Sequence, residues 1–298
     1  FSAEILKDKN QLPLSDFQFT LWLSNTFESK AKKLNICARK RVKGILDLEK
    51  LNTALALIIK KHETLCYRVF SFRPVQALQK NPPLEIAVKN LKSLSDKESE
   101  IILETSFNEL RALYPWPKNQ PLLMVRLFYL KNKKTEIQLC MPHIISDHVS
   151  PAILFSDLSN FYLSGQLPSL NRDTIYREYI FKEQAYTQTY FHRDFIFWDD
   201  YLEDAALFTF PAEYVVSNMK KSKIPYSTYT EINQEALQNL RLFCAHNHIS
   251  LNDGLSSVLL LALYNCCGYK LNTRSPICIT RVKSTRDDHK YDKTIGCF

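Results

Sequence analysis

Residues 140–150 read Cys-Met-Pro-His-Ile-Ile-Ser-Asp-His-Val-Ser, and they decide how the rest of the chain is interpreted. A strand-like run leads into a loop that carries His143 and, four positions later, Asp147, before a helical pattern begins at Ile153. A histidine at the end of a strand can face a cleft and act as a general base near neutral pH. An aspartate four residues later can brace the same loop through an ion pair with an arginine.

The chain on both sides of this stretch alternates between helical and strand-like hydrophobic spacing. Apolar residues at helical spacing predict helices at 14–27 (with Ser15 as N-cap), 48–62, 96–113, 153–163, 175–202, 234–247 and 252–267. Strand-like runs lie at 36–44, 64–70, 84–88, 122–130, 136–141, 226–232 and 276–282, and 211–223 is an irregular linker. This alternation predicts a mixed α/β protein with helices packed on a sheet.

The small number of glycines excludes several kinds of site. The 298 residues contain only five glycines, and the two nearest, Gly254 and Gly268, are far apart in the sequence. The sequence therefore has no G-x-G-x-x-G dinucleotide loop, no phosphate-binding P-loop and no G-x-S-x-G nucleophile elbow. A Rossmann dehydrogenase, a P-loop NTPase and an ordinary α/β-hydrolase are all disfavoured.

The net charge and the cysteines indicate which partners and which cellular compartment to expect. The lysines and arginines behind the net charge of +8 are spread along the chain, which favours an ordinary basic surface over nucleic-acid binding. The eight cysteines form no C-x-x-C pair, and most lie in apolar runs, as buried reduced thiols do. We expect a reducing, cytoplasmic compartment. The longest apolar run, near 258–264, is too short to span a membrane.

Five further segments match motifs of one family, and they do so in the family's order. They are 15–22 (S-x-x-Q-x-x-L-W), 44–55 (G-x-L-D-x-x-x-L-x-x-A-L), 61–70 (similar to R-H-E-x-L-R-T-x-F), 197–202 (F-W-x-x-Y-L) and 295–298 (the start of I-G-x-F-x-N). Together with 140–150, which is similar to H-H-x-x-x-D-G, they resemble the condensation-domain superfamily. Its members are the amide- and ester-forming domains of nonribosomal peptide synthetases and their acyltransferase relatives.

The resemblance implies a fold and a reaction. The fold would be α/β, with two chloramphenicol-acetyltransferase-like lobes in a V-shaped pseudo-dimer: an N-terminal lobe at 1–170, connecting helices and a linker at 171–225, and an incomplete second lobe at 226–298. The reaction would join an acyl thioester on a phosphopantetheine arm, from an acyl or peptidyl carrier protein or coenzyme A, to an amine or hydroxyl acceptor. The domain itself would bind no cofactor and no metal.

The same resemblance assigns roles to individual residues. His143 would accept or orient the proton of the acceptor, and Asp147 would hold the loop through a buried ion pair. The family arginine that pairs with this aspartate is replaced by Cys66, so strand alternation makes Arg68 the proposed substitute. A buried aspartate without a cation would lower the free energy of unfolding by roughly several kcal/mol, so the aspartate needs a positively charged partner. Ser150 is a further candidate for the site.

Two departures from the family signature keep alternatives open. Pro142 stands at the first signature histidine and His148 at the signature glycine, while Arg286 matches a family arginine for which a structural role is expected. His148 could narrow the channel and select a smaller donor, it could join the chemistry, or the domain could be degenerate. A noncatalytic domain that binds a carrier or another protein is the main rival function. An epimerisation-type relative is a second rival.

Cys244-x-His246-x-His248 is the sequence's one metal-like pattern, and we do not expect it to bind a metal. Side chains two positions apart on a helix do not face each other. A closed zinc site also needs a fourth ligand.

Overall fold

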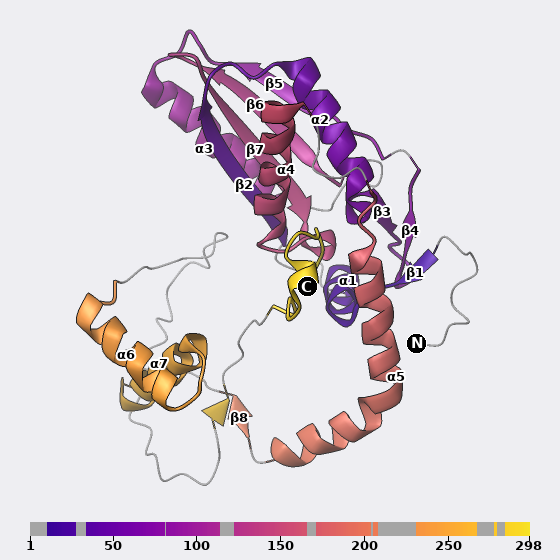
Figure 1. Cartoon of the computed structure of the whole chain (residues 1–298), viewed down its shortest axis with the longest axis vertical. Helices are drawn as coiled ribbons and strands as arrows, with labels where there is room; N and C mark the ends of the chain where they lie inside the picture. Colours follow the sequence, from indigo (N-terminus) through magenta and orange to yellow (C-terminus); the bar gives the residue numbers. More distant parts are fainter. Residues whose placement is uncertain are drawn as a thin grey trace. The chain divides into compact units, whose positions relative to one another are not determined.

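The computed structural model (Figure 1) describes residues 11–27, 34–80, 82–113, 122–165, 171–203, 205–207, 231–266, 277–278 and 284–298. The chain divides into two compact units. Unit 1 contains Phe1–Phe191 together with Ser284–Phe298, and unit 2 contains His192–Lys283. We call Ser284–Phe298 the C-terminal segment. It belongs to unit 1 together with the first 191 residues, and the division into lobes at 1–170, 171–225 and 226–298 stays a prediction.

A four-stranded sheet forms the centre of unit 1, in the order β2 (Asn35–Lys43), β7 (Lys134–Pro142), β6 (Met124–Leu130) and β5 (Ile86–Asn90). β7 is antiparallel to both neighbours, whereas β5 and β6 are parallel. The tight connection between β6 and β7 uses positive φ values of 56° and 52° at Asn132 and Lys133, the conformation that matches the twist of a hairpin. Central β7 is buried along nearly its whole length, so it is a rigid support for the loop that follows it.

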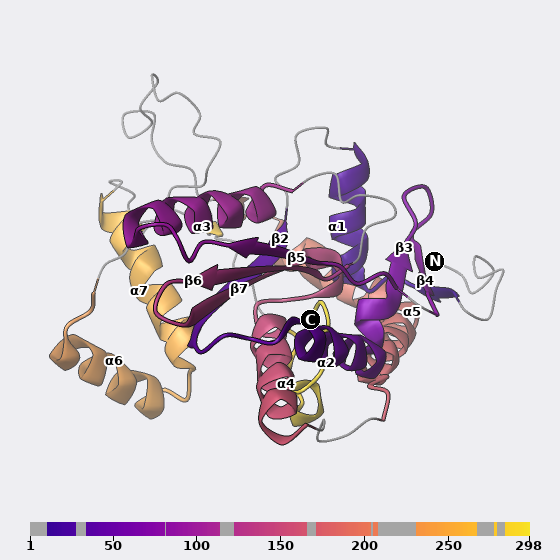
Figure 2. The same ribbon diagram turned by 90° about the horizontal axis from the view of Figure 1, so that it is seen from above.

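Helices cover both faces of this sheet (Figure 2). α3 (Asp96–Arg111) lies on one face, and α2 (Leu48–Lys61) and α4 (Ser150–Ser164) lie on the other. α2 begins where the Asp47 carboxylate accepts the Lys50 N–H at 2.7 Å, and α3 begins with a capping box between Ser95 and Glu98. The main core lies between the sheet and the α2–α4 layer; its fully buried members include Leu51, Leu55, Ile58, Leu127, Leu139 and Leu154.

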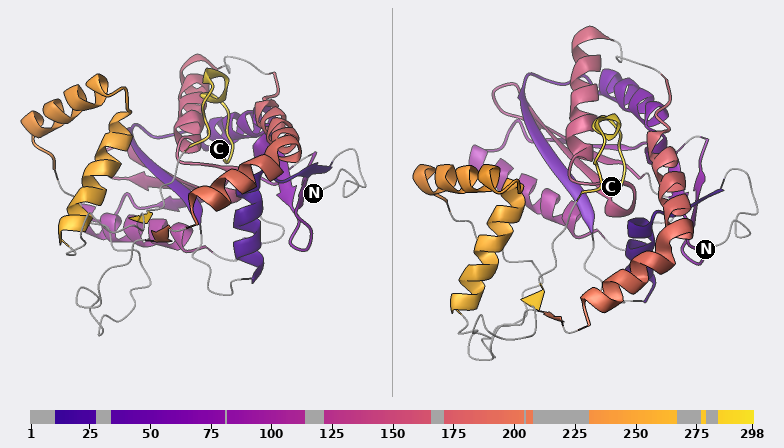
Figure 3. Two further views of the ribbon diagram at one scale, coloured as in Figure 1. Left: turned by 90° about the horizontal axis from the view of Figure 1, so that it is seen from below. Right: turned by 60° about the horizontal axis from the view of Figure 1, so that its bottom comes forward.

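A second, smaller core brings distant parts of the chain together. It contains α1 (Asp16–Phe27), the first turns of α5 (Ile175–Tyr201), the C-terminal segment and a three-stranded sheet of β1 (Gln11–Pro13), β4 (Val75–Leu78) and β3 (Tyr67–Val69). Ser15 caps α1 as expected, since its Oγ accepts the Gln18 N–H at 3.1 Å. Figure 3 shows the C-terminal segment in yellow beside α4 and the first half of α5.

The described part of unit 2 is mainly helical. After the end of α5 it contains β8 (Ala206–Leu207), which pairs in parallel with β9 (Ile277–Cys278), and the helices α6 (Gln234–His246) and α7 (Leu251–Cys266). The linker expected at 211–223 and most of the strand expected at 226–232 lie outside the described residues. No helix in the described ranges is long and apolar enough to cross a membrane.

Most predicted elements of unit 1 are confirmed within a few residues, with one clear exception. The strand predicted at 64–70 begins instead as the 3₁₀ helix η2 (Glu63–Cys66), and only Tyr67–Val69 forms β3. Thr64 explains part of this difference, because its hydroxyl donates to the carbonyl of Ile295 at 2.7 Å and ties η2 to the C-terminal segment.

Candidate functional site

His143 is presented by the end of the central strand. β7 ends at Pro142, which pairs with Asn35 at the last position of the β2–β7 ladder, and the 3₁₀ helix η3 (His143–Ile145) follows. Proline lacks a backbone N–H, so the end of a strand is a position that tolerates it. The His143 N–H donates to the carbonyl of Leu34 at 2.8 Å, which fixes the backbone at the point where the side chain leaves the sheet.

The His143 ring is half-buried between two side chains. The ring of Phe17 on α1 meets it edge-on, with the ring centroids 5.6 Å apart. The Sγ of Cys297 lies 3.7 Å from Nδ1. Phe17 belongs to α1 and Cys297 to the C-terminal segment, so the ring stands where the end of the main sheet meets these two parts of the chain.

Asp147 is buried and shapes the turn between η3 and α4. Its Oδ1 accepts hydrogen bonds from the Val149 N–H at 3.1 Å, the Ser150 N–H at 3.0 Å and the Ser150 hydroxyl at 2.8 Å. The carboxylate therefore satisfies N–H groups at the start of α4, where a negative charge also interacts favourably with the helix dipole. The predicted bracing role of Asp147 fits this geometry.

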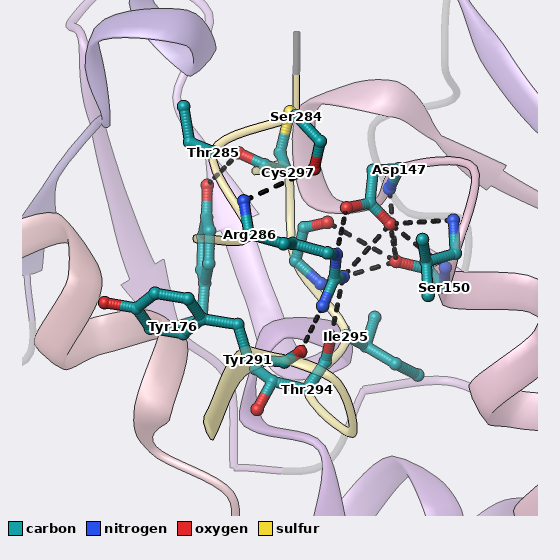
Figure 4. Close-up of polar contacts among 12 residues, drawn as sticks. Asp147, Ser150, Tyr176, Ser284, Thr285, Arg286, Tyr291, Thr294, Ile295 and Cys297 are labelled. Atoms are coloured by element: carbon teal, nitrogen blue, oxygen red, sulfur yellow. Dashed lines mark hydrogen bonds and ion pairs between the residues drawn. The ribbon is translucent and has the colours of Figure 1, made fainter. Parts of the chain in front are cut away.

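Arg286 supplies the cation that Asp147 needs (Figure 4). Its Nε donates to Oδ2 of Asp147 at 2.7 Å and its Nη2 donates to Oδ1 at 3.1 Å. Its Nη1 and Nη2 also donate to the carbonyls of Tyr291 and Thr294, and the centre of the Phe298 ring lies 4.3 Å from the guanidinium carbon. Only 7% of the Arg286 side chain is exposed. The pair is thus desolvated on both sides and held by several hydrogen bonds, as a stable buried ion pair must be.

The prediction that Arg68 pairs with Asp147 is wrong. Arg68 is exposed on β3, where its guanidinium carbon lies 5.7 Å from the centre of the Phe70 ring. The alternation argument failed because Cys66, from which it counted, belongs to η2 rather than to a strand. The Cys66 thiol instead donates to the carbonyl of Ile59 at 3.3 Å. Arg286, for which the sequence indicated a structural role, fills that role.

Ser150 connects the Asp147 turn to the C-terminal segment. Its Oγ accepts the Asp147 N–H at 3.1 Å, donates to the Asp147 carboxylate, and lies 3.4 Å from both the N and the O of Gly296. Gly296 is needed for this approach, because a Cβ there would collide with the rings of Tyr176 and Phe298. The sequence named Ser150 only as a candidate, and the structure places it in the Asp147 network.

His148 points away from this network. It is exposed and lines a groove of about 620 Å³ between β2, α3 and the start of α4; other lining residues include Asn35, Cys37, Arg111, Pro151 and Phe155. In the described part of the chain, no hydrogen bond, ion pair or ring contact joins His148 to His143. Its side chain therefore faces the groove rather than the ring of His143.

Sequence reasoning missed the position of Cys297. The apolar surroundings of most cysteines indicated buried thiols, but no cysteine was assigned a part in the site. The structure buries Cys297 completely and places it against His143, while its carbonyl accepts the Tyr176 hydroxyl at 3.1 Å. Burial and the negative charge of Asp147 raise the pKa of the Cys297 thiol well above its ordinary value, so the thiol stays neutral.

The three residues of the metal-like pattern do not share one environment. Cys244 is buried on α6 against Gly254 of α7, whereas His246 and His248 are exposed. Across the described ranges, no three metal-ligating side chains lie close enough together to hold an ion.

Solved structures and curated sequences similar to this chain point to one family. The SgcC5 protein from Streptomyces globisporus matches with a TM-score of 0.69 and 19% identity, over 96% of this chain and 66% of that one. The first condensation domain of the calcium-dependent antibiotic synthetase matches with a TM-score of 0.56 and 24% identity, over 67% of this chain and 49% of that one. Gramicidin S synthase 2 from Aneurinibacillus migulanus is 28% identical over 165 residues.

These relatives are much longer than this chain. The match to gramicidin S synthase 2 covers 55% of this chain but only 4% of that protein. A match to cyclosporin synthetase simA from Tolypocladium inflatum, at 25% identity, covers 94% of this chain and 2% of that protein. The family model named condensation domain matches residues 8–298. The loop that holds His143 and Asp147 thus lies within a match that spans nearly all of the sequence, and the chain belongs to the condensation-domain family.

Proposed function

We propose that this chain catalyses acyl transfer from a thioester to an amine or hydroxyl acceptor at His143. The acceptor nitrogen or oxygen attacks the thioester carbonyl, a new C–N or C–O bond forms, and the C–S bond breaks. Nε2 of His143 takes up or orients the acceptor proton during attack, and that proton leaves with the released thiol. The observation that carries this proposal is the closed Asp147–Arg286 pair, which fixes the loop directly after His143.

The pair supports function through rigidity rather than through contact with the reacting atoms. The described hydrogen bonds of the Asp147 carboxylate go to Arg286 and to the first residues of α4. A catalytic group must be held close to its productive geometry, and small displacements cost large factors in rate. The family departures do not remove this support, because Pro142 ends its strand without disrupting the ladder and His148 faces the groove.

The substrates and partners follow from the family chemistry and form part of the same proposal. The donor would be an acyl group on phosphopantetheine, presented by a carrier protein or by coenzyme A. A basic protein with a net charge of +8 is compatible with an acidic carrier or with a phosphate-bearing arm. We also propose the two-lobed arrangement of the family, with unit 1 as most of the first lobe, and a reducing, cytoplasmic location.

A panel of acyl-pantetheine and acyl-coenzyme A thioesters, offered with amine and alcohol acceptors, tests this function. We expect His143→Ala to lower kcat by about 100-fold or more, the range typical of general acid–base groups. His246→Ala is the matched control, because it removes an exposed histidine from unit 2, and it should leave the rate unchanged. Equal rates for wild type and His143→Ala would overturn the role of His143.

The noncatalytic rival gives a different pattern in the same experiment. If wild type binds a loaded carrier protein but transfers no acyl group with any donor, the chain is a binding domain. His148→Gly adds a second arm, because it restores the family residue and opens the groove lined by His148. Transfer that appears only in His148→Gly would show that this histidine blocks the donor.

A further inference from the structure

The Nδ1 atom of His143 has one polar neighbour among the described residues, and this neighbour is a sulfur atom. The Cys297 Sγ lies 3.7 Å from Nδ1, within hydrogen-bonding range for sulfur. Histidines that take part in catalysis usually have a carboxylate or a carbonyl at this nitrogen, and that partner sets which ring nitrogen carries the proton. Here the carboxylate of Asp147, four positions further along the chain, is already occupied by Arg286, Val149 and Ser150.

The chemistry of the thiol determines what it can do for the ring. The Cys297 thiol is neutral and fully buried, so its sulfur is available as a weak acceptor of an N–H proton. When His143 takes up a proton at Nε2, both ring nitrogens become donors, and the Nδ1–H then needs an acceptor. The sulfur of Cys297 occupies this position in the structure.

The C-terminal segment holds Cys297 rigidly in this place. The backbone of Gly296 lies against the Ser150 hydroxyl, and the Thr294 carbonyl accepts a hydrogen bond from Arg286 at 2.9 Å. The carbonyl of Cys297 itself accepts the Tyr176 hydroxyl. Both Arg286 and Ser150 are bonded to Asp147, so the aspartate and the thiol belong to one network, much of which is visible in Figure 4.

We propose that Cys297 is the positioning residue of His143: its sulfur accepts the Nδ1–H, which fixes the ring and leaves the lone pair of Nε2 free for the acceptor proton. Asp147 therefore acts on His143 through the C-terminal segment and Cys297 rather than by direct contact. The expected effect of Cys297 on the reaction rate rests on the proposed function. Which ring nitrogen carries the proton does not depend on that function, and it can be measured without any substrate.

Nitrogen-15 NMR of the full chain tests the assignment directly. Two-bond proton–nitrogen correlations, recorded at a pH where the ring is neutral, distinguish the Nδ1–H tautomer from the Nε2–H tautomer. The His143 signals are assigned by their loss in His143→Ala. We expect Nδ1–H in wild type and in Cys297→Ser, whose hydroxyl also accepts, and a shift to mainly Nε2–H in Cys297→Ala.

Cys66→Ala is the matched control, because it removes a second buried thiol of unit 1 that bonds to Ile59. It should leave the His143 tautomer unchanged. Nε2–H as the main form in wild type, or an unchanged tautomer in Cys297→Ala, overturns the proposal. The wild-type measurement decides the question even if a variant fails to fold.

Kinetics then separate this proposal from the proposed function. With an active donor and acceptor, Cys297→Ala should lower kcat by roughly tenfold to a hundredfold, as outer partners of histidine do, with little change in KM. Cys297→Ser should recover most of the lost rate, and Cys66→Ala should match wild type. If wild type shows no transfer at all, the proposed function fails, while the NMR result still decides the role of Cys297.

Discussion

The side chains of Asp147 and Glu63 are buried to the same extent, with 3% of each exposed. The arginines that pair with them differ in exposure. Arg286 beside Asp147 is 7% exposed, whereas Arg177 and Arg172 beside Glu63 are 36% and 42% exposed. Glu63 thus has two half-exposed arginines, and Asp147 has one buried arginine. The first arrangement is redundant and partly hydrated, while the second depends on a single long-range partner.

Under the proposed function, the Asp147 pair belongs to the site around His143, whereas the Glu63 cluster belongs to the scaffold. Glu63 also accepts the Tyr67 hydroxyl at 2.6 Å, so the loss of one arginine leaves it with other partners. The loss of Arg286 would leave Asp147 buried beside helix N–H groups, without a cation, in the turn that follows His143. We therefore expect mutations at the two carboxylate sites to differ in both stability and activity.

The largest expected effect is that of Arg286→Met. Removal of one member of a buried ion pair costs about 3–5 kcal/mol of unfolding free energy, because the other charge stays buried. Urea denaturation measures this loss. Asp147→Asn combined with Arg286→Met should recover part of it, because no orphan charge remains. Arg68→Met is the matched control at an exposed arginine and should stay within about 0.5 kcal/mol of wild type; equal losses in both single variants would contradict the assignment of Arg286.

The next effect concerns His62, which lies beside Glu63 and is fully buried between Asp157 at 2.8 Å and Asp173 at 3.5 Å. Burial disfavours its charged form, but the hydrogen bond to Asp157 and the nearby negative charge of Asp173 outweigh burial and raise the pKa of His62 above its ordinary 6.5. The stabilisation from this proton is complete below pH 6.5 and is lost as the pH rises through the raised pKa.

Asp157→Asn tests this proton linkage. We expect it to cost about 2 kcal/mol near pH 6, the worth of a hydrogen bond to a charged group. It should also flatten the decline of unfolding free energy that we expect for wild type as the pH rises above about 6.5. Asp157 itself has a lowered pKa and stays ionised throughout this range. A variant that keeps the wild-type slope would show that His62 is neutral in the folded protein.

The smallest expected effect is that of Arg177→Met, which removes one of the two arginines beside Glu63. Arg177 donates to Glu63 at 2.8 Å, but its solvent exposure screens the pair and Arg172 remains in place. We expect a loss of about 1 kcal/mol or less, and no change in acyl transfer. Urea denaturation and the thioester panel measure both. A loss as large as that of Arg286→Met would mean that the two carboxylates are equally dependent on one cation.

The sequence predicted local structure far better than it predicted partners. α2 was predictable because Asp47 caps it and its buried positions repeat at helical spacing, and β7 because its apolar run is continuous. The strand expected at 64–70 was shortened by η2, whose Thr64 bonds to the distant Ile295. Tertiary contacts of this kind leave no periodic signal in the sequence.

In the candidate site too, sequence motifs predicted single residues but not the distant residues that contact them. His143 and Asp147 were identified by their motif, yet the cation was sought at Arg68, close in sequence to the replaced family residue. Arg286 and Cys297 reach the site from the C-terminal segment. No spacing rule connects positions that far apart, so the ion pair and the thiol contact became visible only in the fold.

The separation between Asp147 and Arg286 also has a consequence for how the protein is made. Asp147 and Arg286 are separated by 139 positions in the sequence. Contacts between residues that far apart form slowly, because closing the long intervening loop costs conformational entropy. A ribosome that has completed the central sheet has not yet synthesised the C-terminal segment. The Asp147–Arg286 pair and the contact between Cys297 and His143 therefore cannot form until residues 284–298 have been synthesised.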